Sequence, residues 1–86
     1  MPLICRFYGI DIRLFYNDHG KPHFHVQYGE FQATVLIESG DVLEGHLPAR
    51  ALAFVREWLS LHRIELGEAW TACREKRQPG RIEPLE

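Results

Sequence analysis

Residues 18–26 read DHGKPHFHV, and they hold three of the five histidines of this 86-residue chain. Side chains of an extended strand point alternately to its two faces. A strand that begins at His23 would therefore place His25 on the same face, and Phe24 and Val26 on the opposite one. Because Phe24 and Val26 are apolar, we expect their face to be the core and both imidazoles to point away from it.

The residues before this strand predict a turn. Pro22 fixes its own φ and disfavours the helical region for the residue before it. Residues 17–20, Asn-Asp-His-Gly, are all common in turns. Such a turn would carry His19 close to the start of the strand.

A hairpin is expected on the N-terminal side, with strands at residues 3–7 and 10–16 joined by Tyr8-Gly9, where the glycine can supply a positive φ. Arg6 would then lie opposite Asp11 on the outer face. The apolar residues of the two strands would face each other in this register: Phe7 with Ile10, Cys5 with Ile12, and Leu3 with Leu14.

A second hairpin is expected from residues 23–28 and 31–38, joined by Gly29-Glu30. Residues 39–41 would end it, and residues 42–45 would add at most a short edge strand. The expected partners are Tyr28 with Phe31, Val26 with Ala33, Phe24 with Val35, and His25 with Thr34.

From Pro48, which suits the first turn of a helix, the apolar period changes from two to 3.6. We predict a helix over residues 49–76, kinked or split near residues 62–65. A straight helix of that length, about 40 Å, would overhang a small sheet. Residues 78–86 are rich in proline and glycine, and we expect them to form a flexible tail. Residues 1–77 would then be a single domain.

These elements predict an α+β fold, an antiparallel meander of four or five strands covered on one face by a C-terminal kinked helix or helix pair. A polar face with apolar spots would stay uncovered, and such a face suits a partner or a dimer mate. Its expected members are Arg6, Asp11, Arg13, His23, His25, Gln27, Gln32 and Thr34, with Ile4, Phe15 and Leu36.

The composition, 45% hydrophobic and 26% charged, is ordinary for a globular protein. A net charge of −2 argues against general electrostatic binding of nucleic acid. Cys5 and Cys73 lie far apart and are expected to be reduced, buried thiols. No run has the length of a signal peptide or the roughly 20 apolar residues of a membrane span. We therefore expect a cytoplasmic protein without membrane contact, and its thin core makes a homodimer one expected assembly.

The first hairpin followed by residues 17–26 resembles a family of small prokaryotic proteins known as domain of unknown function 4160. In that family a similar Pro-His-x-His-Val strand follows a His-Gly turn, and an alanine-tryptophan pair late in the helix matches Ala69-Trp70. The resemblance covers residues 3 to about 77 and brings no established activity with it. Family members are often encoded beside another small protein and are suspected components of toxin–antitoxin pairs, which implies a small protein partner encoded nearby.

Three functions are open at this point, beside a histidine surface that only hydrogen-bonds its own loop. The preferred one is a binding module of a toxin–antitoxin-like pair that docks its protein partner on the histidine-bearing face. Its expected binding residues are His19, His23, His25, Gln27, Arg6 and Arg13.

The second function is an RNA-directed, nuclease-like toxin. His23 or His25 would act as general acid or base, because histidine titrates near neutral pH, and Arg13 or Arg6 would hold phosphate. The sequence contains no nucleophile motif, no phosphate-binding glycine loop and no zinc-ligand spacing, so it leaves open whether the protein is an enzyme.

The third function is metal binding by the His-x-His strand, with His19 or Asp18 as a third ligand. No glutamate or cysteine is placed to complete a ligand set. From the sequence alone we therefore expect no tight metal site and no cofactor.

Overall fold

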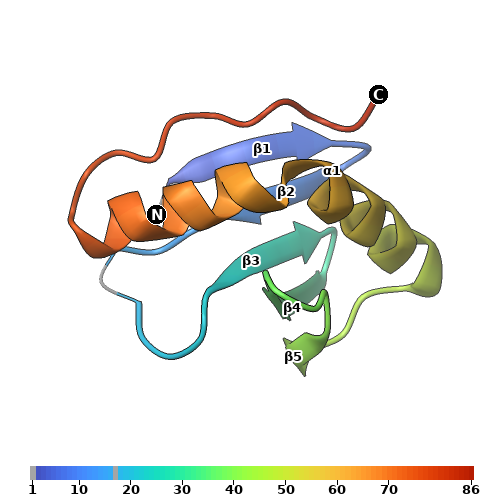
Figure 1. Cartoon of the computed structure of the whole chain (residues 1–86). Helices are drawn as coiled ribbons and strands as arrows, with labels where there is room; N and C mark the ends of the chain where they lie inside the picture. The colour runs from blue at the N-terminus through green and yellow to red at the C-terminus, as the bar shows by residue number, and fades with distance from the viewer. Residues whose placement is uncertain (1, 17) are drawn as a thin grey trace.

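The computed structural model describes residues 2–16 and 18–86; Asn17, where the predicted turn begins, lies outside the described residues. In these described residues, five strands form one antiparallel sheet in chain order, and a single long helix crosses one face of it (Figure 1). This confirms the predicted α+β meander. The elements are β1 (Leu3–Phe7), β2 (Ile10–Arg13), β3 (His23–Tyr28), β4 (Phe31–Leu36), β5 (Val42–Gly45) and α1 (Ala49–Arg74).

The tight turn between β1 and β2 has the predicted two-residue form. Tyr8 and Gly9 both have positive φ, 52° and 78°. Two positive φ values give the chain the twist that matches the flanking strands of a hairpin. The predicted register is confirmed over most of this hairpin, at Phe7 with Ile10, Arg6 with Asp11, and Cys5 with Ile12.

The outer end of β1 differs from the prediction. Leu3 pairs with Arg13 instead of Leu14, because the register shifts between Leu3 and Cys5. A bulge inserts one extra residue and turns its side chain. Ile4 is therefore fully buried in the core, and our expectation that it lies on the uncovered face was wrong.

The second hairpin, β3 with β4, has the predicted register throughout, and β4 ends at Leu36, two residues earlier than expected. The short edge strand β5 is present and pairs with β4. Its last residue, Gly45, has a φ of 82°, and a Cβ there would lie 2.1 Å from the backbone oxygen of Gln32. Only glycine, which has no Cβ, fits at position 45. The confirmed partners are Tyr28 with Phe31, Val26 with Ala33, Phe24 with Val35, and His25 with Thr34.

Helix α1 has the predicted kink. His62, with φ −129° and ψ 22°, departs from helical geometry inside the helix. Figure 1 shows the two halves at an angle, so that both follow the sheet. Val55 and Trp58 before the kink and Leu66 after it are fully buried. The kink thus lets one helix supply the whole second layer.

The segment after the helix differs from the expected flexible tail. Residues 78–86 run beside β1 (Figure 1). The Ile82 N–H donates to the Ile4 carbonyl at 2.8 Å, and Trp58 Nε1 donates to the Glu83 carbonyl at 2.8 Å. Ile82 and Leu85 are buried. The helix already ends at Arg74, and Lys76 follows it with a positive φ of 61°. The residues after Pro79 and Gly80 form an extended segment that can bond to the edge of the sheet.

Both thiols, Cys5 and Cys73, are free and buried, as expected. Burial raises the pKa of each, so both are neutral at physiological pH. In the described part of the chain, no helix combines the length and the apolar character needed to cross a bilayer.

We predict that Val26→Asp unfolds the protein, because it places an unpaired charge in the core and should lower the free energy of unfolding by about 4 kcal/mol or more. Gln27→Asp introduces the same side chain one residue along on the exposed face and should cost only about 1 kcal/mol or less, part of it repulsion from Asp11 on β2. Thermal melts followed by circular dichroism compare them. Equal melting temperatures would show that the faces of β3 are assigned incorrectly.

We predict that Leu85→Ala and Ile82→Ala each lower the free energy of unfolding by about 2 kcal/mol, since each removes buried methyl groups. Glu83→Ala is the control, because its side chain is exposed and only its backbone carbonyl bonds to Trp58. Urea denaturation measures all three. An unchanged midpoint for Leu85→Ala would mean that residues 78–86 do not pack as described.

Candidate functional site

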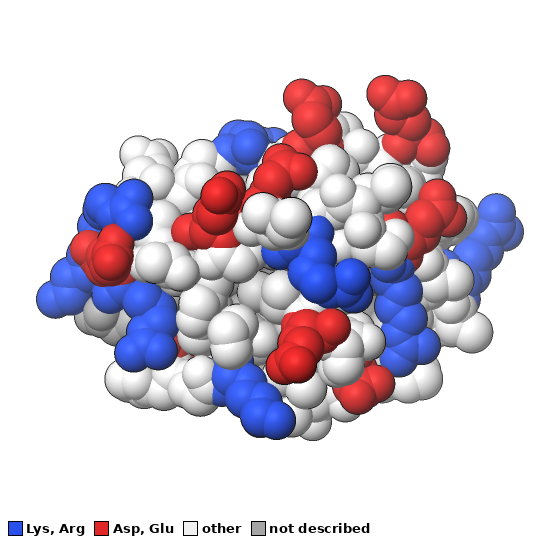
Figure 2. All heavy atoms as spheres, in the orientation of Figure 1, with Lys and Arg blue, Asp and Glu red and all other residues white. Residues whose placement is uncertain are grey.

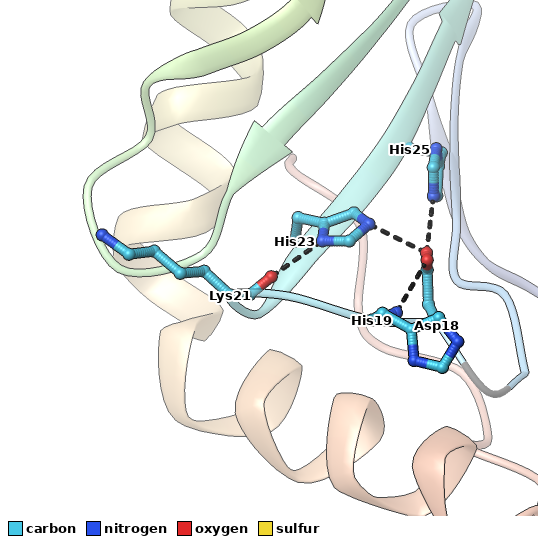
Figure 3. Close-up of polar contacts among 5 residues, drawn as sticks. All are labelled: Asp18, His19, Lys21, His23 and His25. Carbon is cyan, nitrogen blue, oxygen red and sulfur yellow. Dashed lines mark hydrogen bonds and ion pairs between the residues drawn. The ribbon is translucent and has the colours of Figure 1, made fainter.

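The carboxylate of Asp18 joins the two histidines of β3 (Figure 3). Its Oδ2 lies 2.8 Å from Nε2 of His23 and 3.1 Å from Nε2 of His25. The loop that carries Asp18 returns to the strand through Gly20, whose φ is 85°. Residues five and seven positions apart in sequence thereby form one group, which we call the Asp18 cluster: Asp18, His23 and His25.

His23 does not lie open on the uncovered face, contrary to our expectation. Its exposed fraction is 8%, and its ring centroid lies 4.9 Å from that of Trp70 in α1. Strand β2 ends at Arg13, opposite His25, so no β2 residue lies beside His23. With no β2 residue beside it, the His23 ring can extend to α1 and contact Trp70.

The second nitrogen of His23 is also occupied. Nδ1 lies 2.8 Å from the carbonyl oxygen of Lys21. A carbonyl can only accept, so Nδ1 carries a proton and donates it. The His23 ring is therefore fixed at both nitrogens and against one aromatic face.

His25 is half-buried and stacks on Phe15, with centroids 4.0 Å apart and planes inclined by 18°. It also meets the His23 ring edge-on at 5.2 Å. Phe15 and Asp18 thus hold His25 from two sides. The structure brings the two predicted histidines together through Asp18, which the sequence indicated only as an alternative third ligand.

His19 contributes its backbone to this group. Its N–H donates to Oδ1 of Asp18 at 3.0 Å. The ring is exposed, and Figure 3 shows it on the other side of Asp18 from His25. Of the three clustered histidines, two supply ring nitrogens and the third supplies an amide.

Asp18 is held in its charged form. Burial alone would raise its pKa, but the hydrogen bonds from His25 and the His19 amide, with the contribution of His23, outweigh burial and lower the pKa below its usual value. The group at the centre of the cluster is therefore a carboxylate at neutral pH.

The uncovered face of the sheet is concave. A hollow of about 530 Å³ spans β2 to β5, and we call it the open-face hollow. It contains His25, Arg13 and Gln27, three of the six predicted binding residues, while Arg6, His19 and His23 do not line it. Its lining is Arg13, Phe15, His25, Val26, Gln27, Gln32, Ala33, Thr34, Glu44 and Gly45.

Both predicted arginines bind one carboxylate beside the hollow. Arg6 Nε donates to Asp11 at 2.7 Å, and Arg13 Nη1 donates to it at 3.3 Å. The hydrogen bond and charge of Arg6, together with Arg13, outweigh burial and hold the pKa of Asp11 below its usual value. Arg13 is thus oriented by a neighbour, and part of its charge is neutralised.

Sequence reasoning missed two contributors, Trp70 and Glu44. Trp70 was assigned to the apolar stripe of the helix, and no spacing in the sequence relates it to His23. Glu44 belongs to the short edge strand, whose pairing with β4 places it at the hollow. Both positions depend on tertiary structure. Only Glu44 had a signal in the sequence, because it lies in the short edge strand expected at residues 42–45.

Residues 9–71 match the model of a protein family described as Domain of unknown function (DUF4160). The chain belongs to this family. The matched stretch contains the Asp18 cluster, the open-face hollow and Trp70, whereas β1 and residues 78–86 lie outside it. No curated protein and no solved structure matches the chain significantly.

We predict a pH-dependent effect of Asp11→Asn. Because folding lowers the pKa of Asp11 from its usual 3.8, its ion pairs stabilise the fold fully above that value, and this stabilisation is lost as pH falls through the folded pKa. At pH 7 the variant should be about 0.5–1 kcal/mol less stable than wild type, as is usual for partly exposed pairs. The difference should shrink as the pH falls below 3.8 and vanish once Asp11 is protonated in the folded state.

Urea denaturation at several pH values measures this difference. Glu30→Gln, at the exposed second turn, is the control and should give no comparable loss. A stability difference for Asp11→Asn that stays constant down to about pH 2 would contradict the ion-pair explanation.

Proposed function

We propose that the protein is the binding component of a toxin–antitoxin-like pair in the prokaryotic cytoplasm, and that it docks a small protein encoded nearby in its open-face hollow. The observation that carries this proposal is the hollow itself, about 530 Å³ on a sheet face that α1 does not cover. The paired-gene context comes from the resemblance to the family.

The lining of the hollow supports a protein as the occupant. It offers side-chain donors and acceptors from four strands together with the aromatic ring of Phe15. Arginine and aromatic side chains are enriched at protein interfaces. Arg13 is oriented by Asp11, and His25 by Asp18 and Phe15. Side chains that are already ordered lose less entropy when a partner binds.

The charges of the hollow indicate what the partner presents. Arg13 lies on β2 and Glu44 on β5, three strands away. A partner with an acidic group over Arg13 and a basic group over Glu44 would complement both. We infer a small protein that lays one segment across the strands with its charges in this order.

RNA is less well supported as the occupant. The chain has a net charge of −2, and three carboxylates, Asp11, Asp18 and Glu44, lie in or beside the hollow. Figure 2 shows acidic and basic side chains interspersed on the helix side of the molecule. A phosphate backbone needs several free cations in a row, and Arg13 shares its charge with Asp11.

The test is co-purification with the neighbouring gene product. We expect Thr34→Arg, which places a long cation in the hollow directly opposite Glu44, to weaken binding about 100-fold or more. The new side chain would overlap the partner and would neutralise Glu44, the charge that the partner's basic group complements. The matched control is Thr71→Arg on the exposed side of α1, which should bind as wild type does. Retained binding by Thr34→Arg would refute docking in the hollow, as would a wild-type protein that binds no neighbour.

The same variants separate the other outcomes. Under protein docking, His25→Ala should weaken binding by about 1–2 kcal/mol. Under RNA chemistry, His25→Ala or His23→Ala would abolish growth inhibition and leave partner binding intact, with a rate loss of about 10²–10⁴-fold. Light scattering of the purified chain shows whether a second copy occupies the hollow instead. In that case wild type would be a dimer and Thr34→Arg a monomer.

A further inference from the structure

Three potential metal ligands converge in the Asp18 cluster. Asp18 Oδ2, His23 Nε2 and His25 Nε2 all lie within 4.8 Å of one another. From this geometry we propose that the cluster is a binding site for one divalent first-row transition-metal ion, of the class that Zn²⁺ represents. The inference goes beyond partner docking and does not depend on it.

The spacing of the donor atoms suits such an ion. Metal–nitrogen and metal–oxygen bonds to these ligands are about 2.0–2.2 Å long, so two ligands of a tetrahedral ion lie about 3.4 Å apart. Asp18 Oδ2 lies 2.8 Å from one ligand nitrogen and 3.1 Å from the other. The ion would displace the hydrogen-bond protons to solvent, and Asp18 Oδ2 would move away from each Nε2 by about 0.3–0.6 Å. The two Nε2 atoms, which lie within 4.8 Å of each other, would close toward the same spacing.

The outer contacts of the ligands are those that orient metal-binding side chains. A ligating histidine usually donates its other ring N–H to a carbonyl or carboxylate. His23 does so through Nδ1, which donates to the Lys21 carbonyl at 2.8 Å and leaves Nε2 for the ion. The His19 amide likewise binds Oδ1 of Asp18, so that Oδ2 is the oxygen that faces both histidines.

Both imidazoles are held in place before any ion binds. The His23 ring packs against Trp70 at 4.9 Å, and His25 stacks on Phe15 at 4.0 Å. Rings that are fixed in this way lose little freedom on coordination. His23 is almost fully buried and His25 half-buried, so water competes weakly for these positions.

Three protein ligands leave at least one coordination position open. Zinc sites with three protein ligands hold water or substrate in the fourth position, whereas structural sites are closed by four. Two histidines with one carboxylate also suit iron and neighbouring ions. Because His25 lines the open-face hollow, the open position adjoins the surface where an incoming group would arrive.

This inference reverses the sequence-based expectation of no tight metal site. That expectation rested on the lack of a glutamate or cysteine to complete a ligand set. The structure selects Asp18 over His19 as the third ligand, because its loop folds back over the start of β3, and three ligands suffice for a site with an open position. The spacing Asp-x₄-His-x-His did not by itself indicate this return of the chain.

The experiment uses the full chain with its purification tag removed and its metal stripped by a chelator. Calorimetric titration with Zn²⁺ should show about one ion per chain. The variants Asp18→Asn and His25→Ala should bind at least about 100-fold more weakly, since loss of even an outer contact costs about 10- to 100-fold. Their matched controls, Asp41→Asn and His46→Ala, lie at exposed positions outside the cluster and should bind as wild type does.

Two further readouts do not depend on the calorimetry. Co²⁺ should give visible absorption whose intensity reports the coordination number, and the bands should be lost in Asp18→Asn. Saturating Zn²⁺ should raise the melting temperature of wild type and leave that of Asp18→Asn unchanged, because an ion that binds only the folded state stabilises it. Circular dichroism confirms that each variant is folded. If His25→Ala does not fold, the comparison of Asp18→Asn with wild type tests the proposal.

Wild-type protein that takes up no metal at micromolar Zn²⁺ would overturn the proposal. So would binding that survives both cluster variants or that is lost in His46→Ala. The titration needs no partner protein, so its failure would leave docking in the open-face hollow untouched.

Discussion

One helix must cover a five-stranded sheet, and most of the structure follows from this constraint. Apolar side chains of β1 to β4 lie on one face and can be buried only against α1 and residues 78–86. A straight helix of 26 residues would extend about 39 Å, beyond the 33 Å longest extent of the molecule. The break at His62 keeps both halves on the sheet. Because α1 packs on one face of the sheet, the other face remains uncovered and concave.

The open face and the helix meet at one place, the start of β3. His25 lies at the hollow, His23 lies against Trp70, and Asp18 joins the two. Two hydrogen bonds through Asp18 therefore connect the hollow to the packing of the helix. Because β2 ends before it reaches His23, no β2 residue lies between the His23 ring and α1. The cluster thus joins the uncovered face of the sheet to the packing between β3 and α1.

The sequence predicted what depends on local periodicity. Alternation through Phe24 and Val26, together with two-residue turns, defined the register of both hairpins, and the length of the apolar stripe predicted the kink. The bulge at Ile4 could not be predicted, because an uninterrupted apolar run does not say which residue is extra. Ile82 and Leu85 stand among prolines and a glycine, a composition typical of a flexible tail. Their burial depends on the edge of β1, which the local sequence does not indicate. The contact between His23 and Trp70 joins distant elements, which no local pattern specifies.

The segment after the helix makes the two edges of the sheet unequal. Unpaired edge strands are templates on which another chain can add a strand and aggregate. Residues 78–86 bond to β1 through the Ile4 carbonyl and cover that edge with buried side chains. Strand β5 is four residues long, and its Leu43 is 55% exposed. A strand this short offers few backbone groups for pairing. Cleavage after residue 77 would instead remove Ile82 and Leu85 from the β1 edge and leave that longer strand open to pairing with another chain.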